Sequence, residues 1–106
     1  MRRKGKIEIN MAKYIVDFTG SKSLQDIHTQ FKQVFDFPDY YGENWSAFWD
    51  CITDMIGDPM YIEVYGFADL QKLSEKHASI FKKCMEDLLR YAGGKYSHIT
   101  HVRYID

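Results

Sequence analysis

The carboxylates of this chain are concentrated in one stretch, residues 36–58, which contains no lysine, arginine or histidine. Its acidic residues are Asp36, Asp39, Glu43, Asp50, Asp54 and Asp58. The whole chain of 106 residues has a net charge of −1, so these six negative charges leave the remainder at +5. Carboxylates gathered in this way can ligate a metal ion, act in acid–base catalysis, or attract a basic partner.

Asp50 and Asp54 are the best candidates for a catalytic or metal-binding pair, but supporting ligands are missing from the sequence around them. The two histidines His98 and His101 would point to opposite faces of a strand. The chain also lacks a glycine-rich phosphate loop, a GxSxG elbow and an HExxH motif. We therefore predict a protein that is not an enzyme and has no cofactor or metal. A small metal-dependent hydrolase built on Asp50, Asp54 and the histidines stays as the less favoured alternative.

The same two aspartates favour an interaction surface. As like charges four residues apart on a helix, Asp50 and Asp54 destabilise it by a few tenths of a kcal/mol. Asp54 and Asp58 also lie at the helix C-terminus, where the helix dipole disfavours negative charge. Aromatic side chains that could anchor a partner lie nearby: Tyr40, Tyr41, Trp45, Phe48 and Trp49. Composition alone leaves an acidic interface and an ordinary acidic loop and helix equally open.

The elements that must position these residues follow from the apolar pattern. Three segments have the composition of strands: Tyr14–Phe18, Met60–Tyr65 and Ser97–Ile105. Four segments have helical spacing or length: 24–35 after the cap Ser23, Trp45–Ile56 after the cap Asn44, Phe67–Lys72, and Lys76–Tyr91 before a stop at Gly93–Gly94. Helices between strands predict an α/β fold with a small three-stranded parallel sheet packed by about four helices. At least one helix covers each face if the winding direction reverses.

The ends and the bulk composition limit the remaining choices. Residues 1–11 are expected to form an N-terminal extension, partly disordered, and residues 12–106 one domain. No apolar run is long enough to span a bilayer, and the basic run MRRKGK is not followed by the apolar region of a secretory signal. We therefore expect a cytoplasmic protein without membrane contact. A pI near 6.4 gives no case for direct nucleic-acid binding.

The stretch Pro38 to Thr53, PDYYGENWSAFWDCIT, resembles the signature of the barstar family, P-[DE]-Y-Y-G-x-N-x-[DS]-A-[LF]-W-D-x-[LI]. Members of this family are small intracellular inhibitors of secreted bacterial ribonucleases. The resemblance extends over residues 12–106 and is looser after Phe67. It implies a barstar-like fold and an immunity protein that binds one basic ribonuclease, one to one, across its active site. We expect the free protein to be a monomer.

The resemblance implies specific roles for residues of this stretch. Asp50 matches the family's inhibitory aspartate, whose carboxylate stands in for the substrate phosphate against arginine and histidine of the enzyme. Tyr40 and Tyr41 match the apolar contacts, and Trp49 a tryptophan partly buried beside the site. The expected partner-binding residues are Asp39, Tyr40, Tyr41, Gly42, Glu43, Asn44, Ser46, Trp49, Asp50 and Asp54, with Asp39, Glu43 and Asp54 as steering charges.

Two positions depart from the best-known member of the family. Ser46 replaces an acidic interface residue, and Met55 replaces a tryptophan near the end of the same helix. A change of this kind alters which partner fits the surface more than how the surface binds. The alternative within the binding class is therefore a barstar-fold protein that binds a different basic partner and does not inhibit a ribonuclease.

Overall fold

The computed structural model describes residues 12–55, 60–96 and 100–105. For residues 92–96 and 100 it describes the backbone but not the side chains. Its elements are β1 (Ala12–Asp17), α1 (Leu24–Phe35), α2 (Trp45–Asp54), β2 (Met60–Tyr65), α3 (Phe67–Leu73), α4 (Glu75–Tyr96) and β3 (Thr100–Ile105). The predicted extension, residues 1–11, and the predicted start of the third strand, residues 97–99, lie outside the described residues. Within the described ranges, no helix has both the length and the apolar character that crossing a bilayer requires.

The three strands form one parallel sheet in the order β1-β2-β3, which confirms the predicted fold class. Ile62 at the centre of β2 is in register with Tyr14 of β1 and Val102 of β3. Met60, Ile62 and Val64 alternate along β2 and are fully or almost fully buried. Because side chains of a strand alternate between faces, these residues define the face that packs on the helices.

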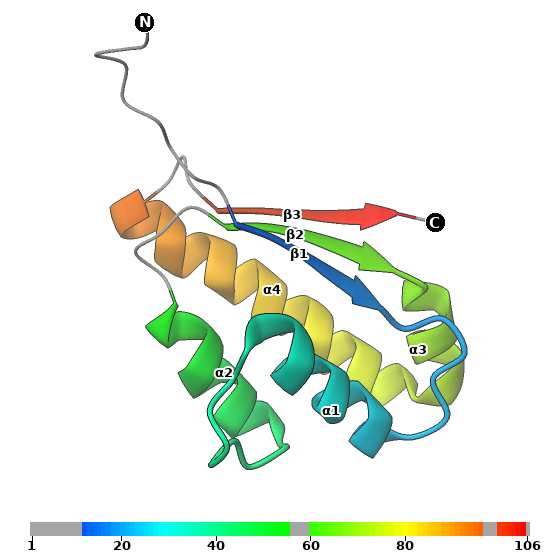
Figure 1. The fold of residues 1–106 in the computed structure, drawn as a ribbon. Helices are drawn as coiled ribbons and strands as arrows, with labels where there is room; N and C mark the ends of the chain where they lie inside the picture. The colour runs from blue at the N-terminus through cyan, green and yellow to red at the C-terminus, as the bar shows by residue number, and fades with distance from the viewer. Residues whose placement is uncertain (1–11, 56–59, 97–99, 106) are drawn as a thin grey trace, which may run out of the picture.

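All four helices lie on one side of the sheet (Figure 1). The strand order never reverses, so each crossover returns the chain to the same face. A helix on each face was expected only if the winding direction reversed, and it does not. Within residues 12–55, 60–96 and 100–105, no helix therefore covers the opposite face of the sheet.

The core between the sheet and the helices is mainly aromatic. The centre of the Phe31 ring, on α1, lies 4.5 Å from the centre of the Phe48 ring on α2 and 5.8 Å from that of the Phe81 ring on α4. The rings of Phe31 and Phe81 are stacked. Phe18, just after β1, meets the Phe81 ring edge-on at 5.0 Å. These four rings are fully buried and join the sheet to three helices. The acidic helix α2 is thus held by the centre of the core.

Helices α1 and α2 start directly after their predicted caps, whereas α2, α3 and α4 end at residues other than those predicted. Ser23 Oγ accepts a hydrogen bond from the Asp26 N–H at 3.1 Å, as predicted for a cap of α1. Helix α2 ends at Asp54, earlier than predicted. The predicted stop at Gly93–Gly94 is wrong, because α4 continues to Tyr96. Glycine costs about 1 kcal/mol inside a helix, a preference small enough for its surroundings to override.

Candidate protein-binding site

Asn44 joins the loop of residues 38–43, here called the tyrosine loop, to the first turn of α2. Its Oδ1 accepts the Ala47 N–H at 2.8 Å, and its Nδ2 donates to the Gly42 carbonyl oxygen at 3.2 Å. A Cβ added at Gly42 would lie 3.2 Å from Asn44 Nδ2, which is tighter than most real contacts. Asn44 therefore determines both where α2 begins and how the loop enters it, as the sequence predicted for a cap.

Replacing Asn44 with alanine is expected to lower the free energy of unfolding by about 1 kcal/mol, because the Ala47 N–H loses its acceptor. Asn44→Ser, which keeps a capping oxygen, is the matched control and should recover most of the loss. Urea unfolding monitored by circular dichroism measures both. Equal stability of wild type and Asn44→Ala would show that the cap contributes nothing.

The two tyrosines of the loop occupy different environments. Tyr40 is 82% exposed, whereas Tyr41 is 6% exposed and belongs to the core. The Tyr41 hydroxyl lies 2.6 Å from Nδ1 of the buried His28 on α1. Both tyrosines were expected as contacts for a partner. Only Tyr40 has that position in the free protein, and Tyr41 holds the loop against α1.

Glu43, at the end of the tyrosine loop, has a left-handed backbone with φ 54°. This conformation is unusual for a residue with a side chain and costs about 1–3 kcal/mol. Strained residues persist where the surroundings determine the conformation, often in binding sites. The hydrogen bonds of Asn44 and the buried ring of Tyr41, one on each side, provide those surroundings.

Two histidines connect the tyrosine loop and α2 to the rest of the protein. Burial lowers the pKa of His28, an effect that nearby Glu43 opposes and His77 reinforces. His77 on α4 accepts a hydrogen bond from Trp45 Nε1 at its Nδ1, over 2.8 Å. The Trp45 and His28 rings lie 4.9 Å apart. Sequence reasoning missed both histidines, since nothing in their spacing relates them to residues 38–54.

Lowering the pH from 7 to 5 is expected to destabilise the protein through His28. Because its pKa is lowered by folding, the unfolded chain binds the proton more tightly than the folded chain. The stabilisation is complete above the ordinary pKa of 6.5 and is lost as the pH falls below it. One proton limits the slope to about 1.4 kcal/mol per pH unit. Urea unfolding at intervals of pH measures it.

The His28→Gln variant should show a smaller slope between pH 7 and 5, whatever its stability at pH 7. His101→Gln, at an exposed histidine of β3, is the control and should keep the wild-type slope. Folding also lowers the pKa of Asp17 and Glu63. Their effect on stability, however, changes with pH near and below their ordinary pKa values of 3.8 and 4.5. Identical slopes for wild type and His28→Gln would contradict the assignment.

The carboxylates around the loop and α2 are exposed and mostly without cationic neighbours. Glu43, Asp50 and Asp54 are exposed, and no ion pair involves them within the part of the chain that the structure describes. Asp39 is different, because Lys32 Nζ of α1 lies 3.6 Å from its Oδ1. Both groups are open to solvent, so this pair contributes little to stability. Three of these four carboxylates therefore carry a charge that no ion pair among the described residues offsets.

Trp49 lies half-buried at the edge of this surface, and Ser46 is exposed one turn before Asp50. The Trp49 ring meets the ring of Tyr91 on α4 edge-on, with 6.4 Å between their centres. Tyr91 is 46% exposed and was not among the expected site residues. Helix α4 therefore adds an aromatic side chain to the edge of a surface that the sequence placed on residues 39–54 alone.

The less favoured alternative from the sequence was a metal site built on Asp50, Asp54 and the histidines. In residues 12–55, 60–96 and 100–105, no three His, Cys, Asp or Glu side chains gather closely enough to hold a metal ion. What the site offers is an array of exposed carboxylates and one exposed tyrosine on α2 and the tyrosine loop, with the half-exposed rings of Trp49 on α2 and Tyr91 on α4 at its edge. This arrangement suits contact with a cationic protein surface.

Comparisons with known proteins agree with this description. Residues 11–103 match the family model described as "Barstar (barnase inhibitor)". A protein of Bacillus subtilis (strain 168) named "Putative ribonuclease inhibitor YrdF" is 37% identical over 57 residues. These residues are 54% of this chain and 63% of that relative, so the match spans less than two thirds of the relative's length.

Proposed function

The chain belongs to the barstar family, and from this premise we propose that it is a non-enzymatic inhibitor that binds a basic secreted ribonuclease and blocks its active site. The observation that carries the proposal is the position of Asp50. It is exposed on α2, a helix whose Phe48 and Ile52 side chains are buried in the core, and it has no ion-pair partner among the described residues. A carboxylate without an ion-pair partner, on a preformed surface, can take the place of a substrate phosphate among arginine and histidine side chains.

The neighbouring residues have supporting roles in this complex. Tyr40 provides the apolar contact, and Tyr41, Gly42 and Asn44 hold the loop in the conformation that presents it. Ser46 lies in the contact one turn before Asp50, and Trp49 closes its edge together with Tyr91. A preformed loop lowers the entropic cost of association, because it need not be ordered on binding.

Glu43 and Asp54 mainly increase the rate of association with the ribonuclease, and Asp39 makes a smaller contribution to this rate. Exposed charges of one sign accelerate the approach of an oppositely charged partner, and salt screens this attraction. Lys32 already offsets part of the charge of Asp39. We therefore expect the association rate to fall with rising ionic strength, whereas the dissociation rate should depend mainly on Asp50 and Tyr40.

Titration of the protein against a panel of secreted bacterial ribonucleases tests the proposal. Inhibition of RNA cleavage and binding by calorimetry should agree on a stoichiometry of one to one, with a submicromolar Kd for the cognate enzyme. A basic, catalytically unrelated protein such as a histone controls for non-specific charge attraction. Absence of binding below micromolar Kd across the panel would contradict inhibition.

A different basic partner is the second candidate, and Ser46 is the observation that favours it. Its exposed hydroxyl occupies the position where an acidic residue could have met a further cation of the enzyme. The surface around Asp50 therefore carries less charge than it could. In this case a protein captured on the wild-type surface would be released by the Asp50→Ala change but would have no ribonuclease activity to inhibit.

A further inference from the structure

The uncovered face of the sheet carries a regular arrangement of polar and aromatic side chains. Strand register places three rows across β1, β2 and β3 on this face. The rows are Lys13–Tyr61–His101, Ile15–Glu63–Arg103 and Asp17–Tyr65–Ile105. Tyr61 lies between Lys13 and His101 in the first row and diagonal to Arg103. It is therefore surrounded by basic side chains, although its strand is the central one.

The single carboxylate next to Tyr61 is withdrawn from solvent. Glu63 is 7% exposed, its Oε1 lies 3.5 Å from Lys13 Nζ, and it accepts a hydrogen bond from the Tyr65 hydroxyl at 3.2 Å. Burial alone would raise the pKa of Glu63, but the tyrosine hydroxyls and Lys13 lower it overall, so it stays charged. The Lys13 ammonium also lies 5.8 Å from the centre of the Tyr61 ring. The exposed charged groups close to Tyr61 are consequently Lys13 and Arg103, whereas the exposed carboxylate of Asp17 lies two rows away.

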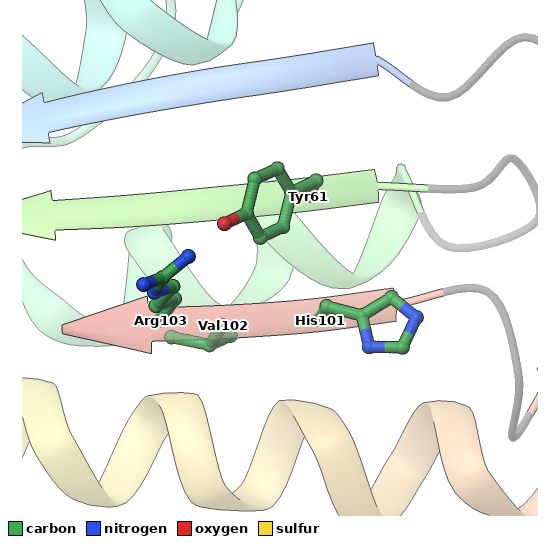
Figure 2. Close-up of a pocket in the computed structure, with 4 residues that line it drawn as sticks. All are labelled: Tyr61, His101, Val102 and Arg103. Carbon is green, nitrogen blue, oxygen red and sulfur yellow. The ribbon is translucent and has the colours of Figure 1, made fainter.

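Tyr61, His101, Val102 and Arg103 line a cavity of about 580 Å³ that is open to solvent (Figure 2). The Tyr61 hydroxyl is turned toward the Arg103 guanidinium, and this contact raises the pKa of Arg103. The volume is within the range of small-molecule sites, and the wide opening would leave part of a ligand exposed to solvent. A guanidinium binds phosphate well, and an aromatic ring provides a surface on which a base can stack.

We propose that the Tyr61–His101–Arg103 cavity binds a nucleotide, with the phosphate at Arg103 and the base against Tyr61. This site is on the face of the sheet opposite the helix layer and is separate from the acidic surface around Asp50. The near-neutral composition of the chain argues against nucleic-acid binding in general. The fold, however, gathers cations and an aromatic ring on one face, where a nucleotide unit can use both.

Binding of uridine monophosphate to the full chain, followed by two-dimensional NMR, tests this site. We expect saturable shifts of the β3 amides, and affinities for uridine or inorganic phosphate that are lower by roughly tenfold or more, because each lacks one half of the contacts. Arg103→Gln and Tyr61→Leu should each lose binding by a similar factor. Arg90→Gln, at an exposed arginine of α4, is the matched control and should bind normally. Thermal unfolding verifies that each variant is folded.

A tetrauridylate strand distinguishes the two sources of a nucleotide. Binding at least tenfold tighter than the monophosphate identifies single-stranded RNA as the ligand, and equal affinity identifies the free nucleotide. Either result supports the site. Equal binding of phosphate and uridine monophosphate, or unchanged binding by Arg103→Gln, would overturn it. No ribonuclease is present in this experiment, and Asp50→Ala should bind the nucleotide normally, so its outcome is independent of the proposed inhibition.

Discussion

Asp50→Ala is expected to weaken binding of the cognate ribonuclease by about 3–5 kcal/mol, roughly a 150- to 5,000-fold increase in Kd. In the proposed complex the Asp50 carboxylate is desolvated among arginine and histidine side chains. Its removal leaves those cations buried without a partner, and this cost makes the loss large. Surface plasmon resonance should place most of the effect in the dissociation rate, since removing one of several exposed carboxylates reduces steering only modestly.

Two variants separate the charge of Asp50 from a general loss of acidity. Glu86→Ala removes an exposed carboxylate from α4 and should leave Kd unchanged. Asp50→Asn keeps the size of the side chain and should lose most of the affinity as well. Binding of Asp50→Ala with wild-type Kd and wild-type salt dependence would refute the anchor role.

The same substitution should not destabilise the free protein. Asp50 and Asp54 are like charges at helical spacing, and removing one relieves a repulsion of a few tenths of a kcal/mol. A small gain in stability together with a large loss in affinity is the pattern of a residue selected for binding. A purely structural aspartate would show the reverse.

Phe31→Ala is expected to lower the free energy of unfolding by about 3–5 kcal/mol. Phe31 is fully buried and packs against Phe48, Phe81 and Phe18, so its removal opens a cavity where three helices and the sheet meet. At about 4–8 °C per kcal/mol, the melting temperature should fall by roughly 12–40 °C. Calorimetry and urea unfolding measure the change.

Phe31→Leu keeps most of the apolar volume and should lose clearly less stability than Phe31→Ala. Gln33→Ala, on the exposed side of the same helix, should change stability by less than about 0.5 kcal/mol. A loss below 1 kcal/mol for Phe31→Ala would mean that the core is not centred on this ring. At temperatures where the variant is still folded, it should bind the ribonuclease normally.

The sequence alone was sufficient to predict the order of elements, the parallel sheet and the caps of the first two helices. Periodicity and capping are local properties, so Ser23, Asn44 and the alternation in β2 can be interpreted without knowing what packs against them. The signature of residues 38–53 likewise identified the family from adjacent residues. The end of α4 was predicted too early, at Gly93–Gly94. The local preference of glycine for a helix end is weak, so it did not determine where this helix stops.

Only the tertiary structure decided which side chains of the site face outward and what holds the others. Tyr40 and Tyr41 are neighbours of one type, yet the buried His28 draws Tyr41 inward and leaves Tyr40 exposed. Lys32, seven positions before Asp39, turns out to be its ion-pair partner, and Tyr91 reaches Trp49 from a helix forty residues away. The Tyr61–His101–Arg103 cavity likewise exists because strand register places residues of β2 and β3 side by side. Contacts between segments distant in the chain depend on packing and register, which no local pattern of residues specifies.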